Sequence, residues 1–170
     1  MALIDWDNSS WREKENGDFI FNLAEITAKT FDVTAEKWSK VIVNTDRGVE
    51  KNQLRNFYDK VLELEEKAIN VNDDEFKIKV LPFIKMLNSK VAYAKNKQQG
   101  SVNKAFVIFM NEAIKQVNSK DTFTNFKFLF EAVLGFFEKE DRRNNILFIR
   151  RDEENNRQNN RRANNHRRRK

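Results

Sequence analysis

The chain has 170 residues, 39% of them hydrophobic and 34% charged, with a formal net charge of +6. A single domain is the expectation for this length, and one core can bury most of its apolar surface. Only 4 Gly and 1 Pro are present, which argues against an all-β fold with many tight turns.

The sequence indicates a cytoplasmic protein without a membrane partner. No apolar run approaches the roughly 20 residues that cross a bilayer, and residues 1–11 lack the basic and then apolar pattern of a signal peptide. The absence of Cys excludes disulfides and Cys-ligated metals, and it is compatible with a reducing compartment.

The positive charge is concentrated at the C-terminus. Residues 150–170 contain nine Lys or Arg and three Asp or Glu, whereas residues 1–149 contain 23 of each kind. This Arg/Asn-rich composition offers too little apolar surface to offset the entropy of ordering, so residues 142–170 are predicted to form a disordered basic tail. The high pI is therefore weak evidence that the folded part binds nucleic acid.

Two further segments precede this tail. Residues 1–33 are predicted to be a flexible N-terminal arm with a short helix opened by Gly17. Trp6 and Trp11 of this arm either dock on a partner or pack on the chain's own core. Residues 34–141 carry apolar residues at helical spacing and are predicted to form the helical core domain of an all-α protein.

The core domain is predicted to be a single bundle of the five-helix type, rich in Phe. The helices are expected from about residue 35 to 43, 50 to 69, 74 to 97, 102 to 118 and 122 to 140. Their expected N-caps are Thr34, Asp73 or Asp74, Ser101, and Asp121 or Thr122. Pro82 lacks an amide hydrogen and clashes with the preceding turn, so a kink or break is predicted near Leu81.

The end of the third predicted helix has two distinct faces. Leu87 and Val91 recur at helical spacing and are expected to face the core. Lys90, Tyr93 and Lys97 lie within roughly 60° of one another on a different sector of the helix. Two cations that flank an exposed aromatic ring can contact a nucleic-acid backbone and an unstacked base, although the same pattern also fits a solvated helix end.

Catalytic chemistry is poorly supported by the sequence. His166 is the only histidine, and it has no acidic or Cys cluster around it that fits a metal centre. Neither a Walker-type loop nor a GxGxxG motif is present. Glu63, Glu65 and Glu66 have the spacing of a solvated helix face. We therefore expect no enzyme, and no metal or other cofactor.

Three segments together resemble one family. They are Gln53–Asp59, Lys90–Lys97 and Phe126–Val133, and in this order and spacing they look like the small helical subunit of type III-A CRISPR effector complexes, the Csm small subunit. The resemblance covers about residues 53–139. Many members have Gly-Arg where this chain has Asn96–Lys97, and Lys keeps the charge of Arg but loses its planar, bidentate fork.

The resemblance implies an all-α fold and a non-catalytic subunit that is present in several stacked copies. Such subunits line the path of the guide RNA and the target RNA beside the other subunits of the complex. In these complexes, target cleavage is assigned to the backbone subunits, and DNA cleavage and cyclic oligonucleotide synthesis to the large subunit. The partners implied are thus both RNAs, the other subunits and further copies of this chain.

Seven residues are candidates for sequence-independent RNA contacts. They are Lys90, Tyr93, Lys97, Arg55, Lys127, Gln53 and Lys95. A surface ion pair at i+4 is the competing interpretation for two of them, with Asp59 as partner of Arg55 and Glu131 as partner of Lys127. Tyr93 either stacks on a base or covers the core.

Helix geometry ranks these candidates. Gln53 and Arg55 flank the apolar stripe of their helix on opposite sides, about 160° apart, so at most one is expected to touch the ligand of Lys90. Lys95 lies across the stripe from Lys90 and ranks lower. An alternative function is a helical assembly module whose folded part binds no nucleic acid, and which uses Phe128, Ile108 and the N-terminal tryptophans.

Overall fold

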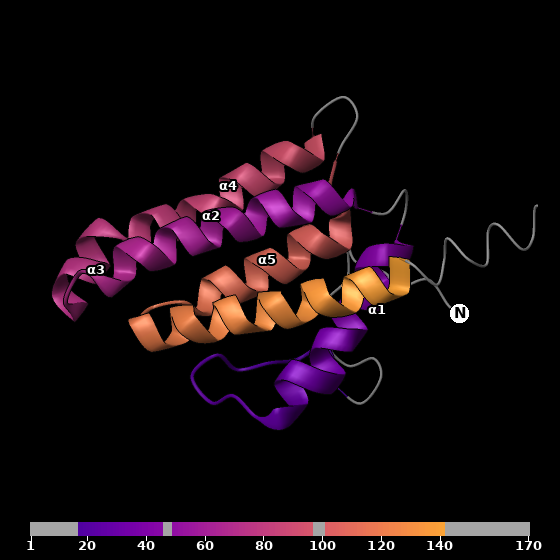
Figure 1. Cartoon of the computed structure of the whole chain (residues 1–170), viewed down its shortest axis with the longest axis horizontal. Coiled ribbons are helices and arrows are strands. Elements are labelled where there is room, and N and C mark those ends of the chain that lie inside the picture. Colours follow the sequence, from indigo (N-terminus) through magenta and orange to yellow (C-terminus); the bar gives the residue numbers. More distant parts are fainter. Residues whose placement is uncertain (1–16, 46–48, 97–100, 142–170) are drawn as a thin grey trace, which may run out of the picture.

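The computed structural model describes residues 17–45, 49–96 and 101–141, and these residues form helices with no strand among them (Figure 1). The predicted all-α fold is confirmed. Five longer helices are α1 (Ala35–Asn44), α2 (Lys51–Ile69), α4 (Leu81–Asn96), α5 (Lys104–Gln116) and a helix over residues 120–141. The predicted tail, Trp6, Trp11 and Lys97 lie outside the described residues.

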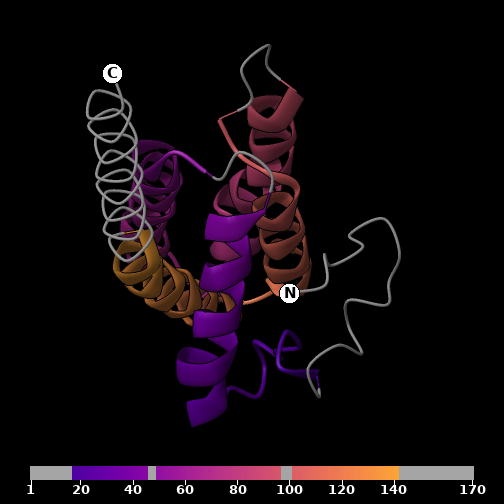
Figure 2. The ribbon, with the colours of Figure 1, turned by 90° about the vertical axis from the view of Figure 1, so that its right-hand side faces the viewer.

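Helix α5 is the centre of the bundle. It contacts both α4 and α1, and it lies among the other helices in both views of the ribbon (Figures 1 and 2). Its buried residues occur on more than one side of the helix: Ala105, Phe106, Phe109, Met110, Ala113 and Ile114. Val107 and Ile108 are half-buried and pack against the same core.

Aromatic rings fill this core. Phe130 lies between the rings of Tyr58, Phe106, Phe109 and Phe126, with centroid separations from 5.6 to 6.1 Å. Rings at this distance interact favourably beyond the apolar area that they bury. The Phe-rich composition thus serves the core, as the helical spacing of these residues predicts.

The segment before the helices packs on this core. Residues 20–27 contain turns instead of the predicted short helix, and Phe19 and Leu23 are almost wholly buried. Trp38 Nε1 donates to the carbonyl of Phe19 at 3.0 Å, and the Gln116 side chain binds the backbone of Phe21 and Leu23. These contacts tie part of the predicted arm to α1 and α5, while the boundary at residue 33 stays a prediction.

The predicted N-cap Thr34 is wrong. A π-helix, η3 (Thr30–Thr34), runs directly into α1, and the Thr34 side chain forms no capping hydrogen bond. Thr34 is buried and helical in backbone conformation, so it lies inside a helix that begins at residue 28. The apolar residues 31 and 33 of this turn continue the helix upstream of the predicted start.

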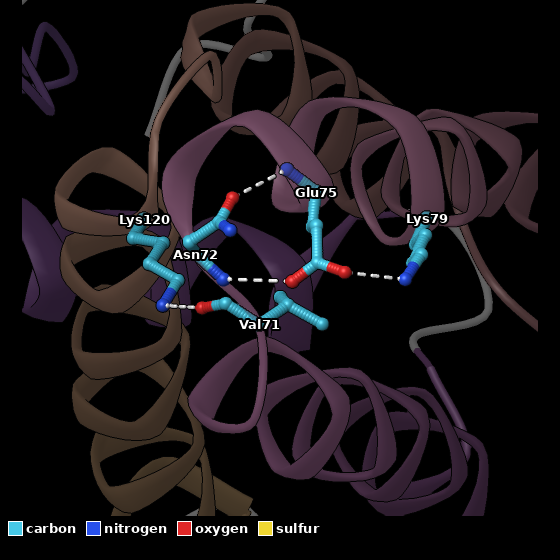
Figure 3. A network of polar contacts seen from close by, with 5 residues as sticks. All are labelled: Val71, Asn72, Glu75, Lys79 and Lys120. Atoms are coloured by element: carbon cyan, nitrogen blue, oxygen red, sulfur yellow. Dashed lines mark hydrogen bonds and ion pairs between the residues drawn. The ribbon is translucent and has the colours of Figure 1, made fainter.

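The other predicted caps lie one to three residues from the observed ones. Asn72 caps α3 (Asp73–Lys79) in a capping box with Glu75, in place of Asp73 or Asp74 (Figure 3). Asn103 caps α5 instead of Ser101, which itself lies in the preceding connection. The Ser119 hydroxyl accepts from the amide of Thr122 and thereby caps the helix over residues 120–141.

The predicted break before Pro82 is confirmed. Helix α3 ends at Lys79, Val80 follows it, and α4 begins at Leu81. Pro82 therefore occupies the first turn of α4, where its missing amide hydrogen costs no intrahelical bond. In the part of the chain that the structure describes, no helix has both the length and the apolar character needed to cross a membrane.

Candidate nucleic-acid interface

The outer side of α4 presents Lys90 and Tyr93 to solvent. Ile84, Leu87 and Val91 of the same helix are buried, whereas Tyr93 is 72% exposed and Lys90 is also exposed. This is the separation of faces that the helical spacing predicts. Lys95 is exposed too, but at about 100° per residue it projects some 140° away from Lys90.

Arg55 lies on the other side of α2, against the helix over residues 120–141. One guanidinium nitrogen of Arg55 is 2.5 Å from Glu138 Oε1, and Lys51 Nζ is 3.5 Å from the same oxygen. The hydrogen bond from Arg55 holds the pKa of the Glu138 carboxyl below its ordinary value. The carboxylate that engages Arg55 thus comes from another helix rather than from Asp59, the partner expected at i+4.

Lys127 is also engaged across helices. Its Nζ is 2.6 Å from Glu65 Oε1 on α2, and the Lys127 side chain is only 14% exposed. The same ammonium group lies 4.2 Å from the ring centroid of Phe128. Glu131, the partner expected for Lys127, instead lies near the phenol of Tyr58. Burial, and after it the charge of Glu131, raises the pKa of Tyr58 to about 12.

Lys60 binds the Glu63 carboxylate on the side of α2 that faces α4, and Lys67 and Lys90 act on that carboxylate through their charge. Lys60 Nζ is 2.7 Å from Glu63 Oε1, and Lys67 Nζ is 5.9 Å from the ring centroid of Phe83 on α4. Hydrogen bonding from Lys60 holds the pKa of Glu63 below its ordinary value, and the charges of Lys60, Lys67 and Lys90 add to this effect. We call Lys60, Lys67, Phe83 and Lys90 the α2–α4 face.

Sequence reasoning missed Lys60, Lys67 and Phe83. The signal was a spacing of seven residues, which repeats a helix side within about 20°. Gln53, Lys60 and Lys67 share that spacing on α2, as do Phe83 and Lys90 on α4. These residues form one face only because α2 packs beside α4, and this packing cannot be derived from the spacing (Figure 1).

One hollow among the described residues is small and open. A cavity of about 190 Å³ is lined by Glu65, Ala68, Ile69, Lys120, Phe123 and Thr124. Lys120 is engaged at its rim, because its ammonium group donates to the carbonyl of Val71 (Figure 3). Among the described residues, no three His, Asp or Glu side chains gather in a way that would hold a metal ion.

The fold defines a class, a small all-α protein built around one aromatic core. A family model described as Csm2 Type III-A matches residues 25–142 of this chain. The chain therefore belongs to the Csm2 family of type III-A CRISPR complexes. Comparisons with curated proteins and with solved structures gave no match.

Family membership confirms the resemblance drawn from the three sequence segments, and the match extends beyond the region that they span. It makes the chain a structural subunit of a type III-A complex, with the other subunits of that complex as its partners. The match begins at residue 25, shortly before η3, and ends at residue 142, directly after the last described helix.

Proposed function

We propose that this chain is a non-catalytic subunit that binds RNA through sequence-independent contacts and lines the path of the guide RNA and the target RNA. The observation that carries the proposal is the exposure of Lys90 and Tyr93 on one side of α4, in a chain of the Csm2 family. An ammonium group releases counterions when it binds a phosphate, and an exposed phenol ring offers a stacking surface to a base.

The candidate residues differ in whether a carboxylate of this chain binds them. In the described part of the chain Lys90 forms no ion pair, whereas Arg55 and Lys127 each bind a carboxylate. Arg55 and Lys127 would have to give up these partners to reach RNA, so they rank below Lys90 and Tyr93. Gln53 lies on the same side of α2 as Lys60, the side that faces α4. Its position is therefore compatible with an RNA contact beside Lys90 and Tyr93.

The direct test is a pair of charge reversals, one at Lys90 on α4 and one at Lys97, which follows α4 and lies outside the described residues. We expect Lys90→Glu combined with Lys97→Glu to weaken binding of single-stranded RNA in a gel-shift titration, because both changes remove attraction and add repulsion. Circular dichroism should show unchanged helix content, since the Lys90 side chain is exposed. The same pair in a chain that lacks Arg150–Lys170 measures the share of the basic tail.

Unchanged affinity in both backgrounds would remove this face from the proposal. The alternative, an assembly module without RNA affinity in its folded part, is favoured by Phe128, which is 45% exposed. It predicts that the tail-less chain binds no RNA and still self-associates in light scattering. Self-association that accompanies RNA binding instead fits a subunit present in several copies.

A further inference from the structure

The α2–α4 face combines lysines from two helices around one carboxylate. Lys60 donates to both oxygens of Glu63, at 2.7 and 2.9 Å. Both side chains of this i,i+3 pair are about half exposed, so, unlike the more covered pair of Lys127 and Glu65, it contributes little and can be exchanged for a phosphate. Lys67 on the next turn and Lys90 on α4 are near enough for their charges to act on the same carboxyl group. Lys60 is paired with Glu63, and Lys67 and Lys90 bring two further cations to the same carboxylate.

The geometry places these side chains in two opposed rows. Lys60 and Lys67 are seven residues apart on α2, and Phe83 and Lys90 are seven apart on α4, so each pair shares a helix side. The two helices contact each other and run antiparallel, because the short helix α3 joins them as a hairpin (Figure 1). Lys67 consequently lies beside the Phe83 ring.

Two exposed aromatic rings lie on either side of Lys90 along α4, and Tyr93 projects about 80° away from Phe83 around the helix axis. Phe83 is 49% exposed and Tyr93 is 72% exposed, although both are large apolar or aromatic side chains. Their separation of ten residues corresponds to about 15 Å along the helix axis. Alternation of cations and exposed rings is the arrangement that tracks the backbone of a single strand and stacks its bases.

We infer that the α2–α4 face is a binding track for single-stranded RNA, in which Lys60 and Lys67 contact phosphates and Phe83 stacks on a base. This inference rests on the proposed function and extends it to three residues and a second helix. Charge complementarity favours RNA over a protein surface, because a protein interface would bury surplus cations without partners, whereas RNA supplies one anion per nucleotide.

The test uses the full chain, a short labelled single-stranded RNA and the slope of log affinity against log salt concentration. Each phosphate contact to a single strand contributes about 0.7 to that slope, so Lys60→Gln with Lys67→Gln should reduce its magnitude by up to about 1.4. Lys115→Gln, an exposed position on α5, is the matched control and should leave the slope unchanged. The basic tail is present in every variant and cancels in the comparison.

Two further variants separate RNA contact from loss of fold. Glu63→Gln removes the single anion of the cluster, and we expect it to tighten binding, an effect that a destabilised fold does not produce. Phe83→Leu keeps apolar area but removes the ring, and it should weaken binding about five-fold or more. Circular dichroism verifies helix content for each variant.

The inference fails if the lysine pair, Glu63→Gln and Phe83→Leu all leave RNA affinity and slope unchanged while Lys90→Glu still weakens binding. If Lys90→Glu is also without effect, the proposed function itself fails. Loss of self-association by Phe83→Leu in sedimentation, with RNA affinity intact, would identify the face as a protein interface and overturn the inference.

Discussion

Lys127 on the helix over residues 120–141 binds Glu65 on α2, with 2.6 Å between Nζ and Oε1. Arg55 binds Glu138 across the same two helices. Two cations that were predicted to contact RNA thus join helices of the bundle to each other. Lys90 and Tyr93 on α4 instead face solvent, so stability and RNA binding are expected to separate in variants.

Lys127→Met should therefore lower stability and leave RNA affinity nearly unchanged. The substitution removes the partner of a largely covered carboxylate, which costs about 1–3 kcal/mol. Urea denaturation measures the loss, and Lys77→Met at an exposed position of α3 is the control, expected to change stability by less than about 0.5 kcal/mol. A strong loss of RNA affinity with unchanged stability would reverse the roles assigned to Lys127.

The Asn72 cap gives a second prediction. Its side chain accepts from the amide of Glu75 at 2.9 Å, and Glu75 in turn binds the Asn72 amide and Lys79 (Figure 3). Asn72→Ala should cost about 1 kcal/mol of unfolding free energy. Asp74→Asn, with a side chain that is 94% exposed, should cost less than about 0.5 kcal/mol. Equal losses would mean that the acidic residues cap this helix after all.

Tyr58 predicts a change in stability at high pH. Burial and the neighbouring Glu131 raise the pKa of its phenol from 10.0 to about 12. Because the folded state favours the neutral phenol, this contribution to stability is complete below pH 10 and is lost as pH rises through about 12.

The Tyr93→Phe variant isolates this titration, since the chain contains only two tyrosines. Phenolate absorbance should then report a midpoint at about 12 in the folded protein and at about 10 in concentrated urea. A folded-state midpoint close to 10 would show that Tyr58 is open to water.

The positions of the helices follow from the apolar spacing. Leu54, Phe57, Val61 and Leu64 recur at helical spacing on α2, and all four are buried. The break near Pro82 follows from its missing amide hydrogen and from the clash of its ring with the preceding turn. These features depend on residues close in sequence, and this is why the all-α fold was predictable.

The cap of α5 involves contacts that are distant in sequence. Asn103 rather than Ser101 caps α5. The side-chain nitrogen of Asn103 also donates to the carbonyls of Ile42 and Thr45 at the end of α1, and these contacts favour Asn103 as the cap. They join residues about sixty positions apart. A local preference for Ser or Asn cannot distinguish between two polar residues so close together.

In the candidate site, too, some features follow from residues close in sequence and others from contacts between helices. The shared sector of Lys90 and Tyr93 follows from helix geometry, whereas the i+4 rule suggested the wrong carboxylates for Arg55 and Lys127. Their observed partners come from a neighbouring helix, so only the packing of the bundle reveals them. The role of Lys60 and Lys67 likewise depends on α4 lying beside α2.

The outer side of α4 is proposed to contact RNA inside the complex. The most direct measurement places the photoreactive residue benzoylphenylalanine at position 93 or, as a control, at position 128 of the full chain in an assembled type III-A complex. We expect a cross-link to RNA from position 93 and none from position 128. A cross-link from position 93 to protein alone would contradict it.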